Sequence, residues 1–152
     1  MLRNPLVIVG GQVQQNQLGD YVADVIERLN GSGTTAVIGN PIYAHSAVDA
    51  RRAFATGIAT AKVIGICVST SVANGSAMLI QTSGVVQATT TQWDTVTGDS
   101  GGLTAGSYYY LGTSVGSLTK TAPQTLGQVV AQVGKALSTT ELLLEIGPTI
   151  EL

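Results

Sequence analysis

Residues Val63–Gln87 read VIGICVSTSVANGSAMLIQTSGVVQ, a run of apolar, β-branched segments separated by Asn, Gly and Ser. The longer stretch from Val63 to Thr119 contains no Lys, Arg, Glu or His, and its only formal charges are Asp94 and Asp99. The whole chain is 11% charged, whereas an ordinary soluble domain is about 25% charged. Lys and Pro normally shield strand edges, so a neutral β-rich surface is poorly protected against sticking to its neighbours. We therefore expect other subunits to cover much of this surface, which favours a structural building block over an enzyme.

The bulk composition excludes several classes of protein. With 152 residues, 44% of them hydrophobic, the chain is long enough for one domain with a core. Seven scattered Lys and Arg and a net charge of -2 do not form the basic surface that nucleic-acid binding needs. No apolar run approaches the length of a membrane helix or a secretory signal. No phosphate-binding loop is present, and we expect no cofactor.

The single cysteine, Cys67, lies in the apolar run Val63–Val68. One cysteine excludes an intrachain disulfide and the multi-cysteine zinc patterns. We interpret Cys67 as a buried thiol that packs as a small hydrophobic residue. This usage fits a protein that is assembled in the cytoplasm of the cell that makes it.

Short β-strands dominate the expected secondary structure. Alternation and β-branching predict strands over Ala36–Tyr43, Ala61–Val68, Ser76–Gln81, Val85–Thr91, Ser107–Leu111, Ser117–Lys120, Gln128–Ala136 and Glu141–Ile146. Pro41 restricts the first of these to a sheet edge or to its own first position. The turns between strands are too short for parallel crossovers, so most of the strands should pair as antiparallel hairpins. The predicted fold class is mainly β, an antiparallel barrel or sandwich.

The N-terminal part follows a different pattern. Asn4–Gln15 is expected to be an extended apolar arm, the kind of element that subunits exchange. A short helix is predicted over Asp20–Leu29, because one helical face would carry Val22, Val25, Ile26 and Leu29. We therefore divide the chain into an arm plus helix, residues 1–33, and a β-rich body, residues 34–152. A second short helix or turn is predicted over the Ala-rich segment Ala47–Ala55, with Ser46 as its cap.

The string Gly98–Gly102 (GDSGG) matches the sequence around the nucleophile of chymotrypsin-like serine proteases. His45 lies upstream, with Asp49 or Asp94 between them, which is the chain order of that catalytic triad. The physical case is against a protease, because the body is short for two barrels and a substrate groove. Asp and Ser flanked by glycines also form an ordinary turn. We therefore interpret the string as a turn and predict no catalytic residues.

The remaining polar candidates also favour structural roles. His45 is the only histidine, so it has no second histidine with which to build a usual zinc site, and a surface or interface position is favoured. Asp94 and Asp99 could share a cation. Their spacing does not match a calcium loop, so turn capping is favoured over a metal site.

The run Tyr108–Tyr110 allows two interpretations. In a strand, Tyr108 and Tyr110 share one face and Tyr109 takes the other. The rings could form a sugar-binding or subunit-contact platform, since Tyr is enriched at interfaces. Alternatively they reflect β-propensity, with one ring in the core. The lack of charge around them favours the interface.

Two parts of the chain resemble a known class of protein. The C-terminal part is a series of turn glycines and apolar positions: Trp93–Gly98, Gly102–Gly106, Tyr109–Leu111, Gly116–Thr119, Pro123, Val133–Thr140, Ile146 and Ile150. The N-terminal part is Pro5–Gln15 with Gly19–Asp20. Both resemble virion structural proteins of tailed bacteriophages, of the head-decoration and fibre types. Residues Val22–Thr60 carry no part of this resemblance, and their role is not assigned by it.

The resemblance implies an oligomeric all-β module without catalysis, located in the virion. The favoured hypothesis is a capsid decoration, or cement, protein on the capsid surface, which forms a symmetric oligomer, a trimer, and bridges subunits of the major capsid protein. The alternative is a spike, fibre or tail protein that binds a host glycan through Tyr108–Tyr110. The candidate interface residues are Leu6, Val7, Ile8, Val9, Val22, Val25, Ile26, Leu29, Tyr108, Tyr109 and Tyr110.

Overall fold

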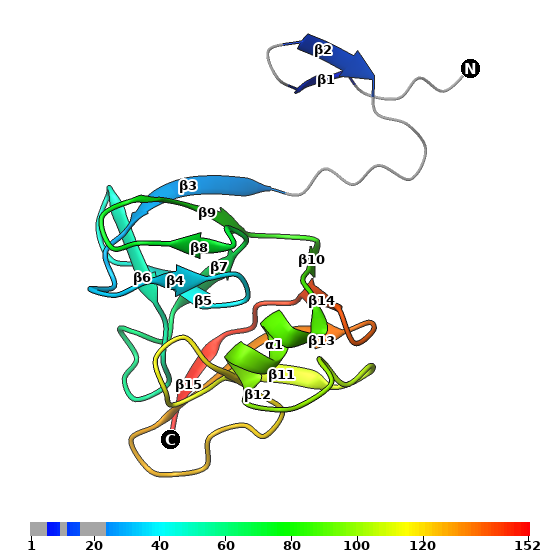
Figure 1. Cartoon of the computed structure of the whole chain (residues 1–152). Helices are drawn as coiled ribbons and strands as arrows, with labels where there is room; N and C mark the ends of the chain where they lie inside the picture. Colours follow the sequence, from blue (N-terminus) through cyan, green and yellow to red (C-terminus); the bar gives the residue numbers. More distant parts are fainter. Residues whose placement is uncertain (1–5, 10–11, 16–23) are drawn as a thin grey trace.

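The computed structural model describes the backbone of Leu6–Val9 and Gln12–Gln15 and all of residues 24–152 (Figure 1). Residues 1–5, 10–11 and 16–23 lie outside the described part. The two N-terminal segments are strands β1 (Leu6–Val9) and β2 (Gln12–Gln15), which pair antiparallel with each other. The sequence predicts β structure over Asn4–Gln15 as one extended arm, whereas the described residues of this segment are two strands that pair with each other.

The first half of the body is a closed five-stranded barrel with the order β3-β6-β5-β7-β9 (Figure 1). Its strands are β3 (Val25–Asn30), β5 (Pro41–Ala44), β6 (Asp49–Arg52), β7 (Val63–Cys67) and β9 (Ala77–Gln81). All pairs are antiparallel except β3 with β6. The single strand predicted over Ala36–Tyr43 is two strands, β4 (Ala36–Val37) and β5, separated by residues 38–40. Pro41 is the first residue of β5, one of the two positions that the sequence allowed it. A separate two-stranded ladder pairs β4 with β8 (Ser71–Val72). In the sequence, β4 precedes β5 and β8 follows β7.

The second half of the body is a six-stranded sheet. Its main path is β10-β14-β13-β11-β12, and β15 pairs with the first part of β13. The strands are β10 (Val85–Gln87), β11 (Tyr108–Leu111), β12 (Leu118–Thr119), β13 (Val129–Ala136), β14 (Glu141–Leu144) and β15 (Thr149–Glu151). The helix α1 (Thr90–Thr97) connects β10 to β11. The protein is therefore mainly β, with a closed barrel, as predicted.

Two hydrophobic clusters hold these parts together. The smaller one fills the barrel and includes Ile42, Cys67, Met78 and Ile80. The larger one lies between the barrel and the sheet: its barrel side is represented by Ile66 and its sheet side by residues such as Tyr109, Leu111, Val133 and Leu142. Because one continuous cluster contains residues from both halves, residues 24–152 form a single packed body.

Polar contacts also join the barrel to the sheet. The hairpin between β11 and β12 reaches the barrel, where the buried Asn40 donates from Nδ2 to the Gly116 carbonyl at 2.9 Å. Trp93 of α1 is fully buried, and its Nε1 donates to the Thr140 carbonyl at 2.9 Å. The same ring packs against Gly39, at whose position a Cβ would lie 3.3 Å from the indole. Sheet, helix and barrel are thus fixed to one another by hydrogen bonds as well as by packing.

The prediction of a helix over Asp20–Leu29 is wrong in its described part, because Val25–Asn30 is strand β3. The spacing of Val25, Ile26 and Leu29 suits a helical face, but pairing with β9 along five registered positions decides the conformation. Residues 20–23, including Val22, lie outside the described part. Since β3 is a barrel strand, the predicted division at residue 33 passes through the barrel, between β3 and β4.

The structure also corrects the helix predicted over Ala47–Ala55 and the end of the strand predicted over Val85–Thr91. The segment Ala47–Ala55 forms β6 and the turn before it, not a helix, because its alanines fill tightly packed sites: Ala50, Ala53 and Ala55 are fully buried. Ser46 stabilises that turn, since its Oγ accepts from the Val48 and Asp49 N–H groups. The strand predicted over Val85–Thr91 ends at Gln87. Helix α1 then begins at Thr90, and its N-cap residue Thr89 forms a capping box with Gln92.

Closure of the barrel requires a glycine at position 65. A Cβ there would lie 2.2 Å from the Gln81 carbonyl oxygen, in the backbone of the neighbouring strand. We expect Gly65→Ala to lower the free energy of unfolding by about 3 kcal/mol, because two backbone segments must separate. Chemical denaturation measures this. The matched control is Gly75→Ala, where φ is 83° and nothing lies within 4 Å of the added Cβ, so only the backbone conformation is penalised, by about 1–2 kcal/mol. Equal losses in both variants would contradict the steric explanation.

Candidate functional site

The protease-like string forms the turn that ends α1. Gly98 adopts a left-handed conformation with φ of 73°, and its N–H donates to the Asp94 carbonyl at 2.8 Å. The Asp94 carboxylate accepts from the N–H groups of Gly101 and Gly102, at 3.1 and 2.7 Å. Both carboxylate oxygens therefore hold the backbone of the turn. The interpretation of Asp94 as a turn-capping residue is confirmed.

The other residues that follow the chain order of the protease triad do not meet Ser100. His45 is in the turn between β5 and β6, where its Nδ1 lies 3.1 Å from Asp49 Oδ1. Hydrogen bonds from Ser46 and from His45 lower the pKa of Asp49. Asp99 pairs with Lys120 at 3.2 Å. No hydrogen bond joins Ser100 to a histidine or a carboxylate within residues 24–152, and no cluster there of three or more His, Cys, Asp or Glu could hold a metal ion.

We expect a fluorophosphonate probe to leave Ser100 unlabelled, since no base lies in contact with its hydroxyl to activate it. Mass spectrometry of the probe-treated protein measures the labelling, with trypsin as the positive control. Stoichiometric labelling that disappears in Ser100→Ala would show instead that the string is catalytic.

Cys67 lies inside the barrel and is fully buried, as predicted. Burial raises the pKa of its thiol from 9.0 to about 11, against a smaller opposing effect of a hydrogen bond with the Ser69 backbone. The reactive form of cysteine is the thiolate, and burial also keeps reagents out. Cys67 is therefore a packing residue in the barrel.

We expect a disulfide reagent to label native Cys67 only as fast as the barrel opens. At pH 8 a pKa near 11 leaves about one thiol in a thousand ionised, whereas in urea the exposed thiol should react at once. The absorbance of the released thiolate measures both rates. Rapid labelling of the folded protein at pH 8 would contradict the buried position.

The three consecutive tyrosines separate as predicted for a strand. Tyr109 is fully buried, and its Oη accepts from the Thr104 N–H at 2.9 Å. Tyr108 is exposed on the other face, where the Lys135 Nζ lies 5.4 Å from the centre of its ring. Tyr110 is half-buried. Because the ring of Tyr109 is in the core, it cannot contact a partner, and a platform of three rings does not form.

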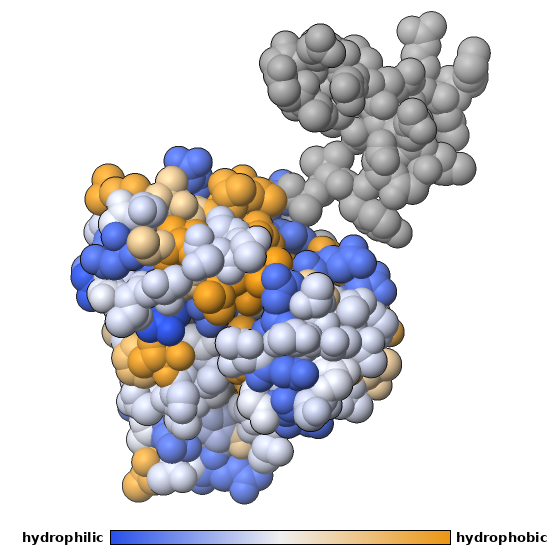
Figure 2. All heavy atoms as spheres, in the orientation of Figure 1, coloured by the Kyte–Doolittle hydropathy of each residue, from blue (hydrophilic) through white to orange (hydrophobic). Residues whose placement is uncertain are grey.

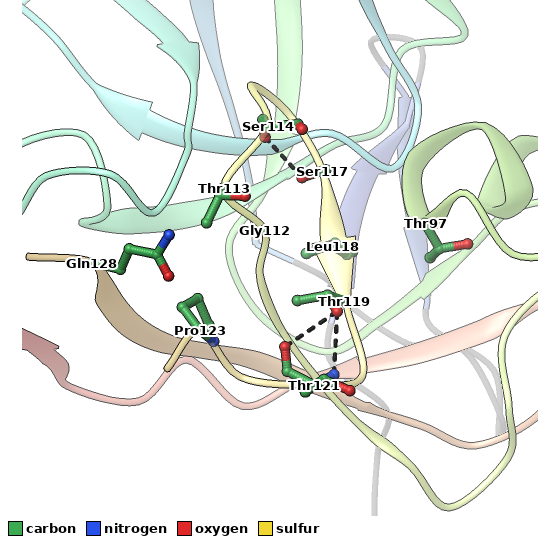
Figure 3. Close-up of a pocket in the computed structure, with 10 residues that line it drawn as sticks. All are labelled: Thr97, Gly112, Thr113, Ser114, Ser117, Leu118, Thr119, Thr121, Pro123 and Gln128. Carbon is green, nitrogen blue, oxygen red and sulfur yellow. Dashed lines mark hydrogen bonds between the residues drawn. The ribbon is translucent and has the colours of Figure 1, made fainter. Parts of the chain in front are cut away.

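A polar cavity of about 370 Å³ lies beside the β11–β12 hairpin (Figure 3). It is lined by Thr97, Gly112, Thr113, Ser114, Ser117, Leu118, Thr119, Thr121, Pro123 and Gln128. Several of its hydroxyls already bond to the local backbone: Ser117 donates to the Ser114 carbonyl at 2.7 Å and Thr119 to the Thr121 carbonyl at 3.2 Å. No ionisable or aromatic side chain lines it. These hydroxyls shape the hairpin, and the cavity offers no group for acid–base or nucleophilic chemistry.

The outer face of the barrel carries a more informative feature, the β3–β9 surface, which we define as Val25, Leu29 and Leu79. Alternation places Val25, Glu27 and Leu29 on the outside of β3, and Leu79 is the cross-strand partner of Glu27. Their exposed fractions are 45%, 44% and 44% for Val25, Leu29 and Leu79. Val48, whose carbonyl accepts from the Leu29 N–H at 3.0 Å, is 65% exposed. Hydrophobic side chains gather on the barrel half of the face shown in Figure 2.

The structure thus divides the predicted interface residues. Val25 and Leu29 lie on the β3–β9 surface, whereas Ile26 points inward and packs against the barrel core. Leu6, Val7, Ile8 and Val9 form β1. Leu79 and Val48 are exposed as well, and neither is among the interface residues predicted from the sequence. Alternation in Ala77–Gln81, with Met78 and Ile80 buried, was the signal that places Leu79 on the outer face.

The comparison with protein-family models finds no match, and the comparison with curated proteins finds none either. The α-helix of residues 24–152 has eight residues, and no described helix is long and apolar enough to cross a membrane.

Proposed function

We propose that the chain is a non-enzymatic capsid decoration protein of a tailed bacteriophage. In this proposal it assembles as a homo-oligomer, a trimer, on the capsid surface and bridges neighbouring subunits of the major capsid protein. It needs no cofactor and binds neither nucleic acid nor membrane. The observation that carries the proposal is the exposed apolar β3–β9 surface on a chain that is only 11% charged.

The physical support for this proposal is that the β3–β9 surface exposes apolar side chains to water. Val25, Leu29 and Leu79 are each almost half exposed and surround Glu27 on the outer face of two neighbouring strands. Apolar side chains gathered on one face in this way mark contact sites. Burying them against a partner removes apolar surface from water, which stabilises association by roughly 25 cal/mol per Å². The depletion of charge is also typical of the core of an interface. The resemblance of the N- and C-terminal parts to phage structural proteins supplies the kind of partner.

A spike, fibre or tail protein that binds a host glycan is the second candidate. The exposed ring of Tyr108 supports it, since sugars stack on aromatic rings. The burial of Tyr109 leaves a smaller platform than the three tyrosines suggested. The copy number in purified particles distinguishes the two functions, because a decoration protein is present in numbers close to those of the major capsid protein and a spike is present in few copies.

We expect the protein to be an oligomer at micromolar concentration, and we expect Leu79→Glu to weaken the oligomer at least about tenfold. The new carboxylate lies opposite Glu27 and would be desolvated in the interface. Size-exclusion chromatography with light scattering gives the mass and its dependence on concentration. The control is Leu126→Glu, a leucine that is 88% exposed outside this surface, which should leave the oligomer unchanged. A wild-type monomer that is also missing from purified particles would rule out the proposed function.

A further inference from the structure

Strand β3 is paired unevenly on its two sides. On one side it pairs with β9 from Val25 to Leu29. On the other side β6 covers only Leu29 and Asn30. In the part of the chain that the structure describes, no strand lies along the remaining edge of β3, residues 25–28. The barrel closes through Leu29 and Asn30. Residues 25–28, the first part of β3, keep an edge to which no described strand pairs, and we call this the open edge of β3.

The hydrogen-bonding groups at this edge follow from the ladder. Leu79 directs its backbone away from β3, since its carbonyl accepts from the Val68 N–H at 2.9 Å and its N–H donates to Ser69 Oγ at 3.0 Å. Its cross-strand partner Glu27 must then direct its own N–H and carbonyl away from β9, and by alternation so must Val25. These are the groups of the open edge.

Most of these groups lack a partner among residues 24–152. The Glu27 carbonyl accepts from the exposed Arg28 guanidinium at 2.8 Å, whereas the Val25 N–H, the Val25 carbonyl and the Glu27 N–H have no recorded hydrogen bond there. The Arg28 guanidinium thus occupies one acceptor of this edge, the Glu27 carbonyl. A solvent-exposed hydrogen bond of this kind contributes little net free energy and can be replaced by one from a backbone N–H. The edge is ready to accept another strand.

The hairpin of β1 and β2 lacks a neighbouring strand in the described part of the chain. Its strands pair with each other and with no strand of residues 24–152. A two-stranded hairpin alone is marginally stable in water, and a third strand is normally required. Its sequences, Leu-Val-Ile-Val and Gln-Val-Gln-Gln, carry no charge, so they can dock beside Val25 and Leu29 without burying a charge of their own.

We propose that the β1–β2 hairpin of a second copy of this chain adds to the open edge of β3, which extends the barrel wall by strand addition. This inference rests on the proposed function, since it names the contact by which the oligomer forms. Backbone hydrogen bonds from Val25 and Glu27 supply the pairing, and the neighbouring β3–β9 surface supplies the apolar contact. Each copy donates one hairpin and accepts one, which is compatible with reciprocal exchange in a dimer and with a head-to-tail ring such as the proposed trimer.

Removal of one backbone donor tests this directly. Glu27→Pro deletes an N–H that faces the open edge and leaves the β9 ladder intact, because proline is tolerated where a strand's N–H faces outward. We expect the dissociation constant of the oligomer to rise about tenfold or more. Glu27→Ala keeps the N–H and should bind like the wild type. Val25→Pro is the second variant, should Glu27→Pro fail to fold, with folding checked by circular dichroism.

Amide hydrogen exchange supplies an independent measurement. In the oligomer the amides of Val25 and Glu27 should be protected, and on dilution to monomer they should exchange fast. The amides of Ile26 and Arg28 face β9 and should be protected in both states. Unprotected Val25 and Glu27 amides in a stable oligomer would overturn the proposal.

Mixing experiments separate exchange between copies from folding back within one copy. Val25→Cys protein is mixed with Val7→Cys protein, or with Ile8→Cys protein, and treated with a short bismaleimide. Adjacent strand residues take opposite faces, so one of the two mixtures should cross-link into a dimer. Cross-linking only when both cysteines are in one chain, with the mass of a monomer, would show that the edge is closed by the chain's own hairpin.

The outcomes for the two proposals remain distinct. An oligomer found in particles that is unaffected by Glu27→Pro overturns the strand exchange and leaves the decoration role standing. A chain that is monomeric and absent from particles overturns both.

Discussion

The structure depends on one strand that is buried on both faces. Ile66 of β7 belongs to the cluster between barrel and sheet, and its neighbour Cys67 belongs to the cluster inside the barrel. Gly65 lies in the same strand. Because it has no side chain, the Gln81 backbone of the neighbouring strand can approach it more closely than any Cβ would allow. A strand of this kind reads as a continuous apolar run rather than an alternating one. Both cores, and the closure of the barrel, meet in these five residues.

Buried amide side chains fix the loops around this framework. Asn30 is fully buried and donates from Nδ2 to the Thr34 and Val72 carbonyls, both at 2.9 Å. Gln81 donates from Nε2 to the Ser83 and Val85 carbonyls, also at 2.9 Å. Asn40 joins the barrel to the β11–β12 hairpin. Each satisfies backbone groups that would otherwise be buried without partners, so the loops have defined positions even though few charges are available to fix them.

The low fraction of charged residues also explains why parts of the surface are apolar and weakly protected against association. The chain is 11% charged with a net charge of -2, so repulsion between like charges does little to keep neighbouring molecules apart. Within β3, only Glu27 and Arg28 are charged and could oppose association at the β3–β9 surface and the open edge. In the proposed assembly these features are covered by another copy, and the hydroxyl-lined cavity near Thr113 is part of a hairpin whose task is to hold the sheet against the barrel.

The sequence by itself determined the mainly β class, the strands around β7, β9, β11, β13 and β14, the turn at Gly98–Gly102 and the buried Cys67. These follow from local alternation, β-branching and turn glycines, which act over a few residues. Helix α1 was not predicted, because the β-branched threonines at its start favoured a strand over Val85–Thr91; the capping box of Thr89 and Gln92 was the local signal that could have identified it. Only the tertiary structure decided that Val25–Asn30 is a strand, because its partner β9 lies about fifty residues away and supplies the pairing that overrides the helical spacing. The exposure of Leu79 and the open edge of β3 were likewise decided by which strands meet, a contact between distant segments that no local pattern contains.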